Sequence, residues 1–280
     1  RMMDRWLATG LDNDTVARLR LILSSALGAA MQAELLSRNV AKLSPAPRAT
    51  PRRVKAMSAD QVVAIAEAVR GTSAEGFATL ALYAGLRRGE VLGLSWADVD
   101  LDKGVVTVRH QLQQIGSEWV LTPPKTAAGE RRVPLPEQAR AALVAQRADQ
   151  ERLRLALGDA WPDTGLVFTT STGHPLTGRD AARKFHRALT LAGLPLMRFH
   201  DLRHAYATML IAVGTHPRVV MELLGHSTIR VTMDIYGHVA EDTARTAIDN
   251  LSAALSAASV QQPRPPENPG GTGDSPPSKA

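Results

Sequence analysis

The chain has 280 residues, of which 44% are apolar and 21% are charged, so it can bury the core of one large domain or of one domain with a smaller companion. It contains no cysteine, which excludes disulfide bonds and thiolate zinc sites and is typical of a reducing compartment. It has no apolar run of membrane-spanning length and no signal-peptide pattern. We therefore expect a soluble, cytoplasmic protein without a membrane partner.

Residues 1–43 are expected to form a small helical segment. Val16 and Leu19 open a series of apolar residues that recurs at helical spacing along residues 15–36. Asp14 precedes this series and is the expected N-cap, since its short carboxylate can accept hydrogen bonds from the first free backbone N–H groups.

Residues 44–57 form a basic, proline-rich linker that lies within the most positively charged part of the chain. The net charge is +6, and residues 1–57 hold ten Lys or Arg against four Asp or Glu, whereas the rest is balanced at 23 of each. A basic linker suits the phosphate backbone of DNA, where charge gives affinity without reading sequence. A solvated linker whose charge only aids solubility fits equally well. The candidate backbone-binding residues of the linker are Arg48, Arg52, Arg53 and Lys55.

From residue 58 to residue 257 the pattern predicts one larger domain, mainly helical with a small sheet. Ser58 and Gln61 form a capping-box pattern at its first helix. Helices are predicted at 59–70, 74–85 and 88–95, followed by a turn at 98–104. Three strands at 105–109, 118–122 and 131–135 are expected to form an antiparallel meander. Further helices are predicted at 136–157, 178–192, 201–213, 217–224, 228–236 and 240–257.

The end of the chain offers cap signals and a tail. Thr215 and Ser227 are the expected N-caps of their helices, and Gly225 stands where a helix C-terminus needs a left-handed residue. The helix at 240–257 has an apolar stripe, which could dock onto a neighbouring protomer or pack on its own core. Residues 258–280 contain six Pro and three Gly and are predicted to be a disordered tail.

Two histidines, His200 and His204, lie four residues apart, which is also the spacing of a helical zinc pair. Arg203 argues against a metal, because it puts a fixed positive charge beside the site, and the chain has no cysteine to complete a common zinc set. With Ala205 and Met209 nearby, we expect His204 to be a buried, hydrogen-bonded histidine.

Other reactive side chains are ambiguous when each is taken alone. Arg87 and Glu90 could simply be an ion pair at a surface helix start, and Arg88 is expected to be solvated or to touch a phosphate backbone. Lys125 is predicted at the tip of a hairpin, where lysines are usually only solvated. Tyr236 has the ordinary place of an amphipathic tyrosine at a helix end.

Five short motifs, taken in their order along the chain, favour a functional role for these residues over an ordinary structural one. They are Gly-Leu-Arg-Arg-Gly-Glu at 85–90, Pro-Lys-Thr with Arg-Arg-Val-Pro-Leu at 124–135, His-Asp-Leu-Arg-His at 200–204, Leu-Gly-His at 224–226 and Tyr-Gly-His at 236–238. In this order the chain resembles the tyrosine recombinase (phage integrase) family over residues 56–240. Residues 14–43 resemble the last helices of that family's core-binding domain.

The resemblance implies a mainly α (α+β) fold. It would consist of a helical catalytic domain with a small three-stranded antiparallel sheet, preceded by a partial, SAM-like core-binding segment. It also implies double-stranded DNA as partner and a homo-oligomer, a tetramer when two DNA sites are paired.

The same resemblance implies site-specific DNA recombination through a 3′-phosphotyrosine, without metal, ATP or another cofactor. Tyr236 would be the nucleophile, and Arg87 and Arg203 would hold the two non-bridging phosphate oxygens. His200 would assist removal of the phenolic proton, Lys125 would protonate the leaving 5′-oxygen and His226 would bind a phosphate oxygen.

Three alternatives remain at this point. A type IB topoisomerase uses similar chemistry to nick and reseal DNA without exchanging strands between sites. A regulator could use residues 215–236 as a helix-turn-helix, although the second helix has only one basic residue, Arg230. A truncated recombinase could bind DNA without recombining it.

Overall fold

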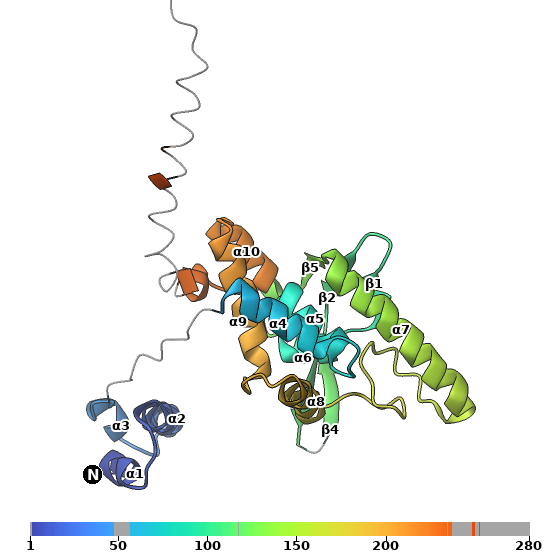
Figure 1. The fold of residues 1–280 in the computed structure, drawn as a ribbon. Helices are drawn as coiled ribbons and strands as arrows, with labels where there is room; N and C mark the ends of the chain where they lie inside the picture. Colours follow the sequence, from blue (N-terminus) through green and yellow to red (C-terminus); the bar gives the residue numbers. More distant parts are fainter. Residues whose placement is uncertain are drawn as a thin grey trace, which may run out of the picture. The chain divides into compact units, whose positions relative to one another are not determined.

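The computed structural model describes residues 2–47, 57–116, 118–233, 235–236, 248–249 and 252. The chain divides into two compact units, residues 1–55 and 56–280, each of which is described by itself (Figure 1). Helices dominate and the strands are few, which confirms the predicted fold class. The four basic linker residues, most of the helix predicted at 240–257 and the tail predicted at 258–280 lie outside the described residues.

The first unit contains the helices α1 (Met2–Ala8), α2 (Asn13–Gln32) and α3 (Val40–Leu43). Asp12, not Asp14, caps α2, because its carboxylate accepts a 2.7 Å hydrogen bond from the Thr15 backbone N–H. The buried Asn39 caps α3 and donates a 2.7 Å hydrogen bond to the Ser24 carbonyl of α2. Arg20 of α2 adds hydrogen bonds to the Lys42 and Ser44 carbonyl groups, so polar side chains from both helices fasten α3 to α2.

The second unit contains seven labelled helices: α4 (Ala59–Val69), α5 (Glu75–Tyr83), α6 (Arg88–Leu92), α7 (Glu137–Leu157), α8 (Gly178–Leu191), α9 (Phe199–Ala212) and α10 (Pro217–Leu224). Residues 229–233 and 235–236 are also helical, as predicted. The capping box of Ser58 and Gln61 is confirmed. The N-cap of α10 is His216 rather than Thr215. Within the described ranges no helix is long and apolar enough to cross a membrane.

The strands are β1 (Val99–Asp100), β2 (Val105–Val108), β3 (Gln111–Ile115), β4 (Glu118–Thr122) and β5 (Arg131–Pro134). A three-stranded antiparallel sheet is present, in the order β1-β2-β5, but its membership was predicted wrongly. β4 pairs instead with β3 in a separate hairpin. β3 was missed because its glutamines give little strand signal, and Lys125 consequently follows the hairpin rather than lying at its tip, which is at Gly116.

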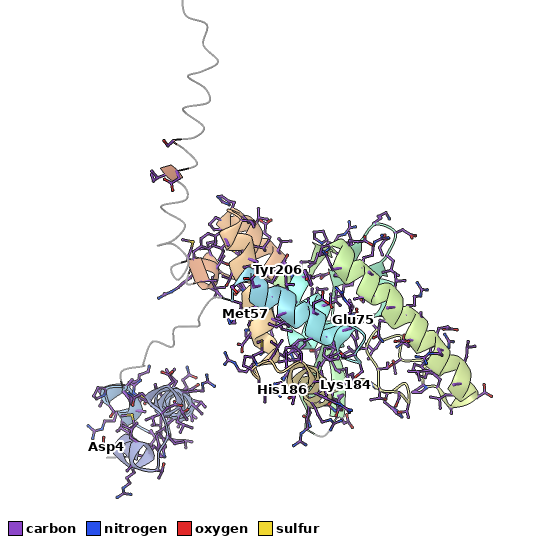
Figure 2. All side chains as sticks on the ribbon, in the orientation of Figure 1. Asp4, Met57, Glu75, Lys184, His186 and Tyr206 are labelled. Atoms are coloured by element: carbon purple, nitrogen blue, oxygen red, sulfur yellow. The ribbon has the colours of Figure 1, made fainter. Side chains whose placement is uncertain are left out.

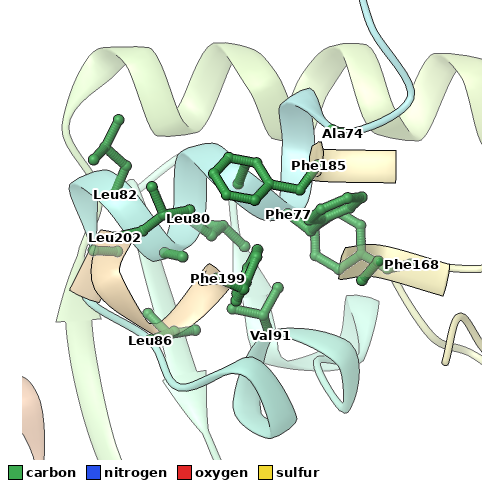
Figure 3. Close-up of a cluster of buried hydrophobic side chains, with 14 of the residues drawn as sticks. Ala74, Phe77, Leu80, Leu82, Leu86, Val91, Phe168, Phe185, Phe199 and Leu202 are labelled. Atoms are coloured by element: carbon green, nitrogen blue, oxygen red, sulfur yellow. The ribbon is translucent and has the colours of Figure 1, made fainter. Parts of the chain in front are cut away.

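The core is built around α5, which is buried on nearly all sides and packs against α4, α7 and α9. Phe77 of α5 has its ring centroid 6.1 Å from that of Phe168 and 5.8 Å from that of Phe199. Phe185 of α8 meets Phe199 edge-on at 5.9 Å (Figure 3). These aromatic contacts hold α5, α8 and the start of α9 in fixed positions.

The turn after α5 sets the direction in which the chain enters α6. Gly85 has a φ of +64°, and a Cβ atom there would lie 2.3 Å from Cδ1 of Tyr206, a residue of α9 that is labelled in Figure 2. Only glycine meets both demands, because other residues disfavour positive φ and carry a Cβ atom. The tight approach of this turn to α9 brings Arg87 to the same region as Arg203.

Gly85→Ala is expected to lower the free energy of unfolding by about 2–5 kcal/mol, since a left-handed alanine costs about 1–2 kcal/mol and overpacking about 1–3 kcal/mol. Gly71→Ala is the matched control, because Gly71 has a φ of +67° but nothing within 4 Å of a built Cβ. Urea unfolding of both variants measures the difference. Equal losses would show that the Tyr206 contact has no energetic weight.

Candidate active site

One buried carboxylate, that of Glu90 in the first turn of α6, faces the neighbouring Arg87 and two arginines from distant parts of the second unit, Arg131 and Arg203. Arg87 donates from Nη1 to Oε1 at 2.7 Å, and Arg131 of β5 donates from Nη2 to Oε2 at 2.9 Å. Nη1 of Arg203, on α9, lies 3.9 Å from Oε2. The carboxylate thus joins α6, the sheet and α9.

The ionisation of Glu90 reflects a competition between burial and these arginines. Burial raises the pKa of the carboxyl group, but the hydrogen bond and charge of Arg131, followed by those of Arg87, lower it to about 2. Glu90 is therefore a carboxylate at neutral pH, although only 2% of its surface is exposed.

Three arginines also bind the last carbonyl groups of α10, which have no partner within the helix. Arg131 donates from Nε to the Leu223 carbonyl at 2.7 Å, Arg203 donates to the Leu224 carbonyl, and Arg87 donates to the Gly225 carbonyl at 2.9 Å. Cations at a helix C-terminus also interact favourably with the helix dipole. The end of α10 and the three guanidinium groups therefore stabilise one another.

Gly225 confirms the predicted left-handed C-cap, with a φ of +62°. A Cβ atom at this position would lie 2.8 Å from both the Ala128 carbonyl oxygen and Nη1 of Arg131. The glycine thus allows the turn after α10 to approach the segment that precedes β5.

Arg203 is almost fully buried and also donates to the Gly85 carbonyl. Burial, together with the repulsion of Arg87, lowers the pKa of Arg203 to about 9, so its guanidinium remains charged at neutral pH. Arg87 uses two of its five guanidinium N–H groups in its bonds to Glu90 and Gly225. Arg203 likewise uses two of its five, in its bonds to Gly85 and Leu224.

His226 follows this turn and is buried beside the arginines. Its Nδ1 lies 2.9 Å from Oγ1 of Thr232, which is also buried. Burial, followed by the charges of Arg203, Arg87 and Arg131, lowers the pKa of His226 to about 4, so the ring is neutral at pH 7. If the Thr232 hydroxyl donates to Nδ1, the single ring proton is on Nε2, and His226 is a neutral hydrogen-bond donor.

His200 and His204 stack edge to face at the start of α9, with ring centroids 4.9 Å apart. His204 is half-buried, so the prediction that this histidine is buried was wrong. His200 is exposed, yet partial enclosure, His204 and Arg203 lower its pKa. Within the part of the chain that the structure describes, no group of three or more His, Asp or Glu residues could hold a metal ion.

Lys125 and Arg88 both lie at the surface. Lys125 follows β4, in a loop where a Cβ atom on Gly129 would lie 2.3 Å from Cβ of Pro124, so the loop folds tightly on itself. The Arg88 side chain lies against the start of α8, since a Cβ atom on Gly178 would be 3.1 Å from its Nε.

Tyr236 lies apart from the arginines. Its hydroxyl donates to the Thr215 carbonyl, just beyond the C-terminal end of α9, and burial raises its pKa. Arg203 precedes Ala212, the last residue of α9, by nine residues, which corresponds to about 14 Å along the helix axis. The structure thus brings Arg87, Arg203 and His226 together and holds Tyr236 at the opposite end of α9.

Two features were missed by sequence reasoning. Arg131 was noted only as part of a motif, although strand alternation places it on the same face as the buried Val133 and opposite to Arg132.

The second feature is a stripe of exposed arginines on α8, the helix on which Lys184 and His186 are labelled in Figure 2. Four-residue spacing puts its members on one face of the helix: Arg179, Arg183 and Arg187.

Comparison with known proteins gives the family. Residues 55–243 match the model of the phage integrase family. The chain is 33% identical over 211 residues to a XerC-like tyrosine recombinase of Caldanaerobacter subterraneus, covering 71% of the chain and 54% of that protein. It is 31% identical over 245 residues to an integrase of Streptomyces ambofaciens, covering 84% of the chain and 63% of the relative. The chain belongs to the phage integrase family and spans less than two thirds of these two relatives.

Solved structures share the fold. The Tn1549 transposon integrase, solved in complex with a circular intermediate DNA, has a TM-score of 0.71 at 24% identity, with 89% of this chain and 83% of that chain covered. A lambda integrase tetramer bound to a Holliday junction has a TM-score of 0.56 at 20% identity, with 84% and 62% covered.

Glu90→Gln is expected to lower the free energy of unfolding at pH 7 by about 3 kcal/mol, because the pKa of Glu90 is lowered from 4.5 to about 2. A lowered pKa gives stability that is present above the unfolded value and is lost as pH falls toward 2. The gap between wild type and variant should therefore shrink as the pH drops below 4.5.

Urea unfolding at several pH values measures this gap, with Glu118→Gln as the control, since Glu118 is exposed on β4. A gap that is the same at every pH would contradict the electrostatic role of Glu90.

Proposed function

We propose that this protein carries out site-specific DNA recombination, cutting and rejoining strands through a 3′-phosphotyrosine on Tyr236 without metal or ATP. The observation that carries the proposal is the pair Arg87 and Arg203, held on one buried carboxylate beside the neutral His226, in a member of the phage integrase family. The two similar solved structures contain DNA, and one is a tetramer. We extend both properties to this chain as part of the proposal.

The two arginines suit a phosphodiester under attack. Each has N–H groups left over from its bonds to Glu90 or to carbonyl groups, and the planar fork of arginine matches two phosphate oxygens. With the Thr232 hydroxyl donating to Nδ1, Nε2 of His226 supplies a further, uncharged donor. Because these groups are already in place, they can stabilise the charge that builds up on the phosphate without rearranging in the transition state.

Tyr236, the proposed nucleophile, must move before it can attack. In the structure the Tyr236 hydroxyl is hydrogen-bonded to the Thr215 carbonyl, and burial raises its pKa, so the phenol is protonated and unreactive. We propose that engagement of DNA releases Tyr236 from Thr215 and carries it to the arginines. Positive charge there would lower the phenol pKa and favour the phenolate.

The proton balance of cleavage uses two exposed residues. As the Tyr236 oxygen forms its bond to phosphorus, its proton passes to His200, whose lowered pKa keeps the ring unprotonated at pH 7 and therefore able to accept it. The bond from phosphorus to the 5′-oxygen breaks, and Lys125 donates a proton to that oxygen. Rejoining reverses these steps with a new 5′-hydroxyl.

DNA binding outside the site rests on the α8 arginine stripe together with Arg88, which adjoins the start of that helix. Phosphate contacts of this kind give affinity and position without reading bases. The four basic linker residues, Arg48, Arg52, Arg53 and Lys55, remain part of the proposal. The named relatives are recombinases and integrases, which favours recombination over topoisomerase activity.

Tyr236→Phe is expected to abolish the covalent protein–DNA adduct on a nicked suicide substrate while DNA affinity is largely kept, because only the attacking oxygen is removed. Tyr83→Phe is the control, since Tyr83 is a half-buried tyrosine of α5. An undiminished adduct in the Tyr236 variant would move the nucleophile elsewhere. A wild-type protein that binds DNA without forming adduct would instead be a binding protein only.

Arg183→Gln is expected to weaken DNA binding for all sequences alike and to reduce the slope of log affinity against log salt by about 1. Arg152→Gln is the matched control, because Arg152 on α7 also pairs with an aspartate three residues earlier at 2.8 Å and has 76% of its side chain exposed, against 73% for Arg183. Filter binding at several salt concentrations measures both slopes. Equal slopes for the two variants would remove α8 from the DNA-binding surface.

A further inference from the structure

We propose that Arg131 is a positioning residue of this site: it holds the loop that carries Lys125 and the turn that carries His226 on the carboxylate of Glu90. Its effect on rate rests on the proposed function, whereas its effect on the loop and the turn does not. Arg131 would not touch the substrate, since only 7% of its side chain is exposed.

All three nitrogens of the Arg131 guanidinium are bonded to protein. Nη1 and Nη2 donate to the two oxygens of Glu90 at 3.2 and 2.9 Å, which makes a bidentate pair. Nε donates to the Leu223 carbonyl at 2.7 Å, and Nη1 also donates to the Gly129 carbonyl at 3.0 Å. One side chain therefore connects α6, the end of α10 and the loop before β5.

These bonds reach both proposed catalytic segments by short steps. Gly129 lies against Pro124, the neighbour of Lys125, so the loop that presents the lysine is held at its other end by Arg131. Leu223 precedes His226 by one turn of chain, and Arg131 packs directly beneath Gly225. A shift of Arg131 would move both segments relative to Glu90.

Lysine could not replace these contacts. Its ammonium group is a single point of charge, whereas the arginine fork reaches both oxygens of Glu90 and the Leu223 carbonyl at the same time. Arg132 provides a matched comparison, because it is the next residue of the same strand, of the same type and exposed.

The arrangement also has a consequence for pH dependence. The groups that face Glu90 are Arg87 from its own helix, Arg131 from β5 and Arg203 from α9, with His226 beyond them at the turn after α10. Burial raises the pKa of Glu90, and the hydrogen bond of Arg131 is the largest influence that opposes it. Without Arg131 the carboxyl group should take up a proton at higher pH and release its hold on Arg87.

The kinetic test compares single-turnover cleavage of a nicked suicide substrate by Arg131→Met, Arg131→Lys and Arg132→Met between about pH 5 and pH 9. Arg131→Met should cleave on the order of 100-fold more slowly at pH 7, as for the loss of one preorganised donor, with DNA affinity kept. As the pH is lowered, the rate of Arg131→Met should begin to fall at a higher pH than the rate of wild type. Arg131→Lys should recover only part of the rate, and Arg132→Met should match wild type. A wild-type rate and pH profile for Arg131→Met would overturn the proposal.

A second measurement needs no activity. Hydrogen exchange of the free, full chain should become faster at residues 125–130 and 223–226 in Arg131→Met and not in Arg132→Met. This result together with an inactive wild type would contradict the proposed function and leave the positioning role standing. Unchanged exchange would overturn the positioning role whatever the activity.

Loss of folding is a separate outcome, because Arg131→Met leaves a buried carboxylate short of its main partner. Glu90→Gln combined with Arg131→Met removes both charges and should melt at a higher temperature than Arg131→Met alone, because no buried carboxylate is left without its main partner. If the double variant folds yet exchanges faster at both segments than Glu90→Gln alone, positioning is supported. If it regains wild-type exchange at both segments, Arg131 serves only to balance Glu90, and the proposal fails.

Discussion

The candidate site depends on one constraint: the buried carboxylate of Glu90 must be neutralised. An isolated carboxylate in this position would cost several kcal/mol, and it is tolerated only because Arg131 and Arg87 hydrogen-bond to it and Arg203 lies near. The same three arginines repel one another, so each needs the carboxylate and the carbonyl groups at the end of α10 to stay in place. The ion cluster and the end of α10 therefore form one unit, and removal of any member leaves others without a partner.

On the proposed function, one half of the site is already assembled and the other half, the nucleophile, has to move. The side chains of Arg87, Arg203 and His226, which we propose bind the phosphate, are held by buried or partly buried hydrogen bonds within the protein. The proposed nucleophile is instead held by one bond to Thr215 and by partial burial. On the proposed function, a protein free of DNA would be unable to attack, because its tyrosine and its phosphate-binding groups lie at opposite ends of α9.

Sequence reasoning succeeded where local chemistry decides the structure and failed where distant contacts do. The capping box at Ser58 and the left-handed Gly225 follow from hydrogen bonding within a few residues, and both are confirmed. β3 was missed because its glutamines pair only through a partner strand that follows in the chain. For the site, the order of motifs selected Arg87, Arg203 and His226, which the structure brings together. It gave no sign that Tyr236 rests on the Thr215 carbonyl, since a tertiary hydrogen bond to a backbone oxygen leaves no residue pattern.

We propose that one rigid set of arginines receives the scissile phosphate and that Tyr236 moves to it. The most direct measurement is a crystal structure of the full chain on DNA carrying the cognate site. We expect the scissile phosphate within hydrogen-bonding distance of both Arg87 and Arg203, the Glu90 cluster unchanged, and the Tyr236 hydroxyl at the phosphate instead of at Thr215. A phosphate bound elsewhere, or a Tyr236 still bonded to Thr215 in a complex competent for cleavage, would contradict this proposal.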